Sequence, residues 1–215
     1  MRRMRAILLL GPTGSGKTPL GDWLQTAGLA GQRCVHFDFG ENLRRVVAEN
    51  RTDAAVSLQD LAFLRRVLAT GALLEDEQFP LAERILRRFL HLQAVDAQTW
   101  VLLNGLPRHP GQAAAMSQLL DVRAVVHLAC SAETVVERIG RDTGGDRAAR
   151  SDDDRDAIRR KLTIYAERTA PLLEFYRSRS VPVITIGVTA EMTPQQMAEK
   201  LLADWSALPT DTDAP

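Results

Sequence analysis

The sequence contains few cysteines, and their positions argue against a disulfide framework. Cys34 and Cys130 are the only two, and both lie in or beside apolar segments typical of strands. In such surroundings a cysteine usually acts as a small buried hydrophobic residue. We therefore expect two free, reduced thiols and a protein of the cytoplasm.

Long apolar segments are also missing, which excludes helices that span a membrane. Three arginines among residues 1–5 precede an apolar segment as in a signal peptide, but that segment is too short and lacks a cleavage site. The formal net charge is zero, so the composition gives no support for binding nucleic acid or an acidic membrane. We expect neither as a partner, and we expect a monomer.

Lysine is scarce among the basic residues. Of 27 lysines and arginines, only Lys17, Lys161 and Lys200 are lysines. A compositional bias of the genome explains this most simply, although planar guanidinium groups also suit an enzyme that binds phosphates. With 215 residues, 45% hydrophobic and 25% charged, the chain suits one globular domain or a core with small insertions.

The most specific motif is a glycine-rich loop, Gly-Pro-Thr-Gly-Ser-Gly-Lys-Thr. It follows an apolar segment and precedes a helical pattern, the context that a G-x-x-x-x-G-K-[ST] phosphate-binding loop requires. Glycines permit a tight turn that aims backbone N–H groups at phosphate oxygens, the lysine can reach the β- and γ-phosphates, and the final hydroxyl can bind Mg²⁺. The loop predicts a bound nucleoside triphosphate, and its residues are Gly11, Pro12, Thr13, Gly14, Ser15, Gly16, Lys17 and Thr18.

Segments typical of strands alternate with helical patterns along the chain. This alternation predicts an α/β P-loop fold of three layers, with a five-stranded parallel sheet and helices on both faces. Ligands of such sheets bind beyond the carboxyl ends of the strands. The predicted strands are 6–10, 34–37, 100–103, 124–128 and 182–186, and the predicted helices include 20–26, 57–70, 79–94, 135–139 and a long one at 155–179.

Basic residues follow several of these strands or lie near a glycine-containing segment. Each alone is most simply a solvated surface charge. Together, at the ligand edge of a sheet with a phosphate loop, they suit phosphoryl transfer, which needs alignment, charge neutralisation and exclusion of water. The candidates are Arg44, Arg108, Arg138, Arg141, Arg150, Arg159, Arg160 and Lys161.

Several motifs, in the same order, resemble those of the nucleoside monophosphate kinases, the group of adenylate kinases and UMP/CMP kinases. The resemblance extends from about residue 5 to residue 202, although Thr18 stands where the family usually has glycine. The motifs are the loop 11–18, Gly-Glu-Asn-Leu-Arg at 40–44, the segment 71–77, Asn-Gly-Leu-Pro-Arg-His-Pro-Gly-Gln at 104–112, the segments 137–139 and 149–153, and Gly187.

The resemblance implies a single kinase domain with two small appendages. A monophosphate-binding insertion would occupy about 38–78, and a short lid about 140–152. The lid contains no cysteine, which excludes the zinc-bearing lid of some relatives. The core would comprise 1–37, 79–139 and 153–208, and 209–215 would form a loose tail.

The resemblance also implies two substrates, ATP with Mg²⁺ and a nucleoside monophosphate. Arg138 and Gly187 would lie near the ATP base, and Thr18 would bind Mg²⁺, with Asn104 acting through water. Gln112 would contact the acceptor base, which favours AMP because an amide can pair with an amidine-like edge. The implied monophosphate-binding residues are Phe39, Gly40, Arg44, Leu74, Gly105, Arg108, Gln112 and Arg150, and the implied catalytic residues are Lys17, Arg108, Arg138, Arg150 and Lys161.

Three residues depart from the family pattern. Asn104 replaces an Asp that helps to hold hydrated Mg²⁺, so metal affinity or turnover is expected to fall. Lys161 replaces a second catalytic Arg, exchanging a bidentate fork for a point charge. Phe39 replaces Thr or a small residue near the acceptor base, where its ring would stack on the base, narrow the pocket or join the core.

The sequence is also compatible with two other functions. The acceptor would be another small metabolite in the first, although the presence of both Arg44 and Arg108 favours one that already carries a phosphate. In the second, the chain binds nucleotides with reduced catalysis, as Asn104 and Lys161 suggest.

Overall fold

The structure, a computed structural model, describes residues 3–50, 52–53, 55–72, 74–146 and 155–206. These residues form one five-stranded sheet in which all neighbouring strands are parallel, in the order β2-β3-β1-β4-β5. This confirms the predicted fold class, and each strand overlaps its predicted segment. The strands are β1 (Met4–Leu10), β2 (Cys34–Asp38), β3 (Trp100–Asn104), β4 (Leu120–Ala129) and β5 (Val183–Gly187).

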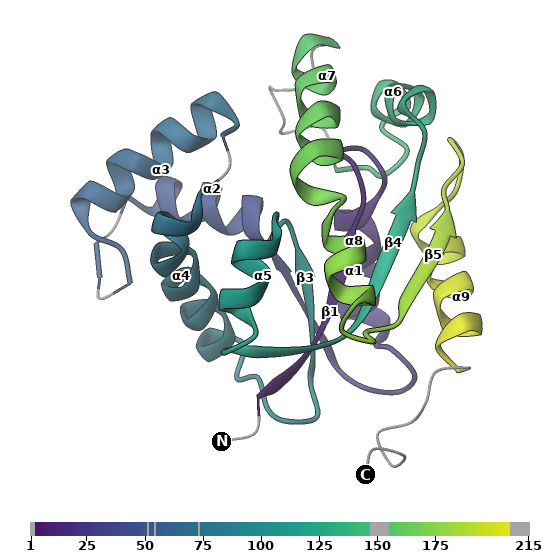
Figure 1. Cartoon of the computed structure of the whole chain (residues 1–215), viewed down its shortest axis with the longest axis horizontal. Helices are drawn as coiled ribbons and strands as arrows, with labels where there is room; N and C mark the ends of the chain where they lie inside the picture. Colours follow the sequence, from purple (N-terminus) through teal and green to yellow (C-terminus); the bar gives the residue numbers. More distant parts are fainter. Residues whose placement is uncertain (1–2, 51, 54, 73, 147–154, 207–215) are drawn as a thin grey trace.

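From Ala6 to Leu10 the central strand β1 is buried on both faces, which explains the uninterrupted apolar sequence of these five residues. Because successive side chains alternate between faces, Ile7 and Leu9 pack in one core cluster while Ala6, Leu8 and Leu10 pack in the other. The first cluster includes α1 (Lys17–Ala27) and α9 (Pro194–Trp205), and the second includes α4 (Phe79–Leu92), α5 (Pro110–Met116) and α8 (Leu172–Arg177). Figure 1 shows these helices around the sheet.

Four further helices lie around the carboxyl end of the sheet. In Figure 1, α2 and α3 stand to the left and α6 and α7 at the top. Asp38 caps the start of α2 by accepting a hydrogen bond from the Glu41 N–H at 2.9 Å. Within the described ranges no helix has the length and apolar character needed to cross a membrane. The four are α2 (Phe39–Glu49), α3 (Leu58–Thr70), α6 (Ala132–Arg141) and α7 (Arg155–Ile164).

The long helix predicted at 155–179 is wrong as one continuous element. After α7 the chain makes a π-helical turn, η2 (Tyr165–Thr169), and then forms α8. In this turn the Ala170 N–H donates to the Tyr165 carbonyl at 2.8 Å, one residue further back than in an α-helix. Pro171 has no N–H and its ring crowds the preceding turn, so the regular ladder cannot pass through it.

Both cysteines are free, as expected. Cys34 is fully buried and its burial raises the pKa of the thiol to about 11, so it behaves as a hydrophobic residue. Cys130 is only half-buried.

Candidate functional site

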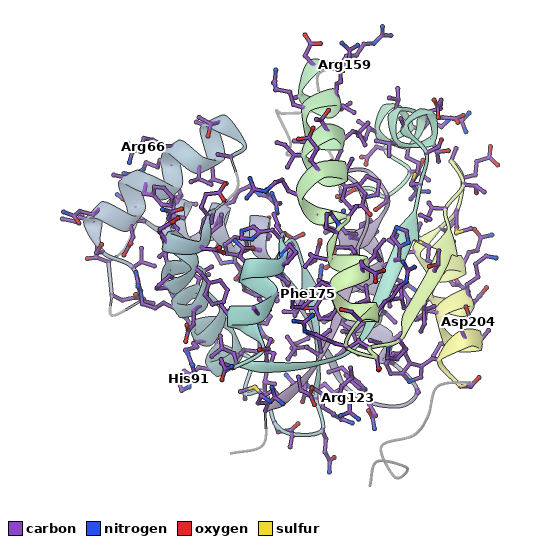
Figure 2. The ribbon with its side chains drawn as sticks, viewed as in Figure 1. Arg66, His91, Arg123, Arg159, Phe175 and Asp204 are labelled. Carbon is purple, nitrogen blue, oxygen red and sulfur yellow. The ribbon has the colours of Figure 1, made fainter. Side chains whose placement is uncertain are left out.

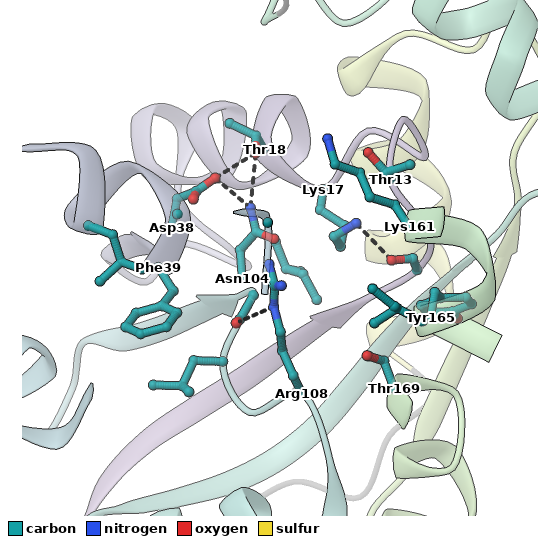
Figure 3. A pocket seen from close by; sticks show the side chains of 18 of the residues that line it. Thr13, Lys17, Thr18, Asp38, Phe39, Asn104, Arg108, Lys161, Tyr165 and Thr169 are labelled. Carbon is teal, nitrogen blue, oxygen red and sulfur yellow. Dashed lines mark hydrogen bonds between the residues drawn. The ribbon is translucent and has the colours of Figure 1, made fainter. Parts of the chain in front are cut away.

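A pocket opens at the carboxyl end of the sheet, where ligands of parallel sheets bind. The segments that form it are far apart in the sequence: the loop before α1, the start of α2, the end of α3, the connection from β3 to α5, and α7 with its π-helical turn (Figure 3). Of the residues predicted to form the site, the pocket is lined by Gly11, Thr13, Gly14, Gly16, Lys17, Thr18, Phe39, Gly40, Arg44, Leu74, Asn104, Gly105, Arg108, Gln112 and Lys161.

The glycine-rich loop has backbone angles that other residues rarely adopt. Gly14 and Gly16 have φ values of 75° and 96°, in the left-handed region. Space is also restricted, because a Cβ on Gly16 would lie 2.9 Å from the Met197 methyl carbon and 3.1 Å from Arg138 Nη2. The backbone angles and the restricted space explain why glycine occupies these positions. The N–H groups of the loop lie at the start of α1, where the helix dipole favours a bound anion.

Lys17 is the first residue of α1 and its side chain turns back over the loop. Its Nζ donates hydrogen bonds to the carbonyl oxygens of Gly11 and Pro12, each at 2.7 Å (Figure 3). The ammonium group therefore lies at the rim of the loop and lines the pocket. A positive charge at this point neutralises phosphate oxygens bound by the loop.

A polar network connects the loop to the ends of β2 and β3. The Thr18 hydroxyl donates to Asp38 Oδ2 at 2.7 Å, and Asn104 Nδ2 lies 3.0 Å from Thr18 Oγ1 and 2.9 Å from Asp38 Oδ2. Behind it, the buried His36 places Nε2 3.4 Å from Asn104 Nδ2 and Nδ1 2.8 Å from an oxygen of Asp22. The predicted proximity of Thr18 and Asn104 is therefore present, and Asp38 completes the group.

Asp38 is a site residue that the sequence interpretation did not identify. It pairs in register with Asn104, so both side chains leave the same edge of the sheet. A carboxylate that directly follows a buried parallel strand is a signal that could have found it.

The oxygen atoms of this network fit Mg²⁺, which prefers hard oxygen ligands and retains several waters and substrate phosphates. Across the part of the chain that the structure describes, no group of three His, Cys, Asp or Glu side chains could hold a metal alone. The site therefore suits a metal that arrives with the phosphates of a nucleotide and that Thr18, Asp38 and Asn104 would help to hold.

Another wall of the pocket carries Arg108, which follows β3. Its Nε donates to the Gly105 carbonyl at 3.0 Å, which orients the guanidinium group toward the pocket (Figure 3). Burial lowers the pKa of Arg108, and the charge of Asp38 opposes that shift. Arginine remains protonated at any physiological pH. Arg108 therefore places a positively charged guanidinium group in this wall, where little water competes for its hydrogen bonds.

Gln112 is buried in the same wall, but both ends of its amide already have partners. Its Oε1 accepts from the Arg108 N–H at 2.8 Å and its Nε2 donates to the Leu74 carbonyl at 2.7 Å. The amide thus joins two walls of the pocket. Each end keeps one further hydrogen-bonding position, because an amide oxygen has two lone pairs and an amide nitrogen carries two hydrogens.

The second basic wall comes from α7. Lys161 extends from this helix into the pocket, above Tyr165 and Thr169 of the π-helical turn (Figure 3). Burial raises the pKa of Tyr165 to about 12, so it stays a neutral lining group. Arg150 and the rest of the predicted lid after Asp146 lie outside the described residues. Arg159 and Arg160 are exposed on α7, and Figure 2 shows Arg159 at its outer end.

Comparison with known proteins agrees with this arrangement. The chain is 32% identical to the adenylate kinase of Xylella fastidiosa strain M23 over 187 residues, which cover 85% of this chain and 90% of that protein. It is 31% identical to the adenylate kinase of Synechococcus sp. strain WH7803 over 203 residues, covering 92% and 96%. The chain belongs to the nucleoside monophosphate kinase family. It is therefore an enzyme of nucleotide phosphorylation, although no family model matches it.

Phe39 stands at a position where the family resemblance leads us to expect Thr or a small residue in the pocket wall. Its side chain is only 4% exposed and its ring lies 6.0 Å from that of Phe37, centroid to centroid, in a tilted contact. It also lines the pocket beside Gly105. The ring therefore joins the core and at the same time narrows this part of the pocket.

Arg138 is the predicted site residue whose surroundings differ most from the expectation. It does not line the pocket, and its side chain is almost fully buried. The guanidinium donates to the carbonyls of Gly14 at 3.1 Å, Thr189 at 2.8 Å and Met192 at 2.9 Å. These acceptors hold the guanidinium group between the phosphate loop and the chain after β5. Among the remaining predicted residues, Pro12, Ser15 and Gly187 also do not line the pocket.

Replacing Arg138 with glutamine is expected to lower the free energy of unfolding by about 2–4 kcal/mol, since each buried group left without a partner costs about 1–3 kcal/mol. Urea denaturation followed by circular dichroism measures the change. Arg141→Gln is the matched control, because its ion pairs with Glu137 and Glu191 are exposed and worth about 1 kcal/mol or less. Equal small losses in the two variants would contradict the structural role of Arg138.

Proposed function

We propose that the protein transfers the γ-phosphoryl group of ATP, bound with Mg²⁺, to a nucleoside monophosphate, with AMP preferred. A phosphate oxygen of the acceptor attacks the γ-phosphorus and the bond to the β–γ bridging oxygen breaks, which gives two nucleoside diphosphates. The observation that carries this proposal is one pocket lined both by the phosphate loop and by Arg44 and Arg108. Two sets of phosphate-binding groups in one pocket suit a direct transfer between two bound nucleotides.

The donor would bind along residues 11–18, with its base toward Arg138 and Gly187 as the resemblance implies. Mg²⁺ neutralises charge on the β- and γ-phosphates when it is bound. Lys17 adds a positive charge at the rim of the loop, and Thr18 offers its hydroxyl oxygen. No general base is required, because phosphoryl transfer depends mainly on alignment and charge neutralisation.

The acceptor would bind in the segment 38–78 and in the connection after β3. Arg44 pairs with Glu41 at 3.0 Å and is half-exposed, so it can turn toward an incoming phosphate. Arg108 faces the same space from the buried side. The remaining acceptor residues that we propose are Phe39, Gly40, Leu74, Gly105 and Gln112.

AMP is favoured by Gln112 and by the similarity of the chain to adenylate kinases. We propose that the acceptor base bonds to the second hydrogen of Nε2 or the second lone pair of Oε1, while Gln112 keeps its bonds to the Arg108 N–H and the Leu74 carbonyl. Closure of the segment 140–152, with Arg150 and Lys161, would complete the charge neutralisation and exclude water. A monomeric state and a cytoplasmic location stay predictions.

An acceptor screen tests the proposal. ADP formation from ATP would be followed by a coupled assay with AMP, CMP, UMP, GMP and dTMP, each with and without Mg²⁺. We expect acceptor-dependent turnover with at least one of them, highest with AMP, and none without the metal. Turnover with none of the five acceptors would refute the proposed reaction, and turnover highest with another base would refute the preference for AMP.

A further inference from the structure

We propose that Asp38 supplies the carboxylate on the metal side of the donor site, the role that the family resemblance places at position 104. This inference rests on the proposed function, because it concerns the metal that accompanies ATP. Position 104 carries an amide, which cannot supply a negative charge. The structure places the missing charge on the neighbouring strand instead.

The two positions are adjacent in the sheet. Asp38 is the last residue of β2, Asn104 is the last residue of β3, and they pair in register. Their side chains meet beside the start of α1, with Asn104 Nδ2 2.9 Å from Asp38 Oδ2 (Figure 3). A carboxylate can therefore reach nearly the same point from either strand.

The hydroxyl of Thr18 is oriented by this pair. Its hydrogen is donated to Asp38 Oδ2 at 2.7 Å, and one of its lone pairs accepts from Asn104 Nδ2 at 3.0 Å. A hydroxyl has two acceptor lone pairs. The second lone pair is consequently the one that can serve a cation in the pocket, next to the negative oxygen of Asp38.

The amide at position 104 is required once the carboxylate is at position 38. A carboxylate in its place would bring two negative oxygens to the separation of about 3 Å at which like charges cannot both ionise. As an amide, Asn104 donates to the Asp38 carboxylate and stabilises its charge. Compared with the family pattern, the negative charge is thus present at position 38 instead of position 104.

The second carboxylate oxygen of Asp38 also has a hydrogen-bond partner, which fixes the side chain. Oδ1 accepts the Glu41 N–H at 2.9 Å and caps α2, so the carboxylate is fixed between the helix start and the Thr18 hydroxyl. Asparagine and serine cap helices about as well as aspartate. Asp38→Asn therefore removes the charge while keeping the cap.

A charge-exchange cycle tests the inference with the full-length protein. The single variants Asp38→Asn and Asn104→Asp and the double variant carrying both are compared with the original protein. The main readout is Mn²⁺ affinity in the presence of a non-hydrolysable ATP analogue, measured by electron paramagnetic resonance, with turnover against Mg²⁺ concentration as the second. Loss of a residue that orients a metal site typically costs about 10–100-fold in metal affinity, and we expect that loss for Asp38→Asn.

The double variant decides the outcome. We expect it to recover most of the lost affinity, because the carboxylate returns beside Thr18 from the other strand, while Asn104→Asp alone does not tighten metal binding. Affinity unchanged in Asp38→Asn, or a double variant as weak as Asp38→Asn, would overturn the inference. Because the metal readout needs no acceptor, absence of turnover in the original protein would refute the proposed reaction and leave this test intact.

Two controls separate charge from folding. Asp121→Asn removes a carboxylate at the start of β4, at the opposite end of the sheet, and is expected to leave Mn²⁺ affinity unchanged. The urea midpoint of every variant verifies that it folds. If Asp38→Asn does not fold, Asp38→Ser, which also keeps a capping oxygen without the charge, takes its place in the cycle.

Discussion

Replacing Lys17 with methionine is expected to lower phosphoryl transfer by about 10²–10³-fold, the usual cost of removing one preorganised group that stabilises charge in the transition state. Methionine keeps much of the apolar stem while it removes the ammonium group that lies over the carbonyls of Gly11 and Pro12. The measurement is the initial rate of ADP formation at saturating acceptor, with the affinity for ATP measured separately by calorimetry.

The scarcity of lysine provides a matched control for this variant. Lys200 is exposed on α9 and does not line the main pocket. Lys200→Met should leave the rate within the small range typical of surface substitutions. If both variants lost activity equally, or neither did, the assignment of Lys17 to the donor phosphates would be contradicted.

Replacing Arg108 with lysine is expected to lower acceptor-dependent turnover by about 10²–10³-fold, although the formal charge is unchanged. A planar guanidinium binds a phosphate with two parallel hydrogen bonds, which an ammonium group cannot do. The Gly105 carbonyl fixes the orientation of this fork by accepting from Nε. Steady-state kinetics with AMP, together with ATP binding to the same variant, measures the effect.

The specificity of the Arg108 effect can be judged from two comparisons. ATP affinity should fall much less than turnover, because the contacts proposed for the ATP phosphates come from residues 11–18 and not from Arg108. Arg123→Lys is the matched control, since Arg123 lies far from the pocket and pairs with Asp121 on the same strand (Figure 2). A variant Arg108→Lys that turned over normally would remove Arg108 from the acceptor site.

The arrangement of the sheet could be predicted from the sequence because each strand is a short apolar segment buried on both faces. Leu8 and Leu9 illustrate this, since they face opposite core clusters and both are fully buried. The rule that ligands bind beyond the strand ends then selected Asn104 and Arg108, and the structure brings both into the pocket.

Other features could not be predicted because they depend on contacts between distant segments. The π-helical turn before Pro171 interrupts a helix whose apolar pattern alone is continuous. Arg138 was predicted from a local motif, but the carbonyls of Thr189 and Met192, more than fifty residues away in sequence, set its position. Asp38 is the first residue of the expected insertion 38–78, and only its register with Asn104 shows its place beside the Thr18 hydroxyl.

The structure also changes the interpretation of Asn104. From the sequence, the amide suggested weakened catalysis, because a charge near the metal was missing. In the structure a carboxylate lies 2.9 Å away, from Asp38, and contacts the same Thr18 hydroxyl. If Asp38 supplies the charge as proposed, Asn104 no longer argues for a binding protein with reduced catalysis, and Lys161 is the departure that still does.

The central claim is that one pocket aligns a triphosphate donor with a phosphate-bearing acceptor. Phosphorus NMR of the purified protein with ATP, AMP and Mg²⁺ tests it most directly. We predict that the ATP and AMP resonances decline together while those of ADP grow, without inorganic phosphate, and that omission of AMP leaves ATP unchanged. An unchanged spectrum with both nucleotides, or ADP that appears together with inorganic phosphate whether or not AMP is present, would contradict the account.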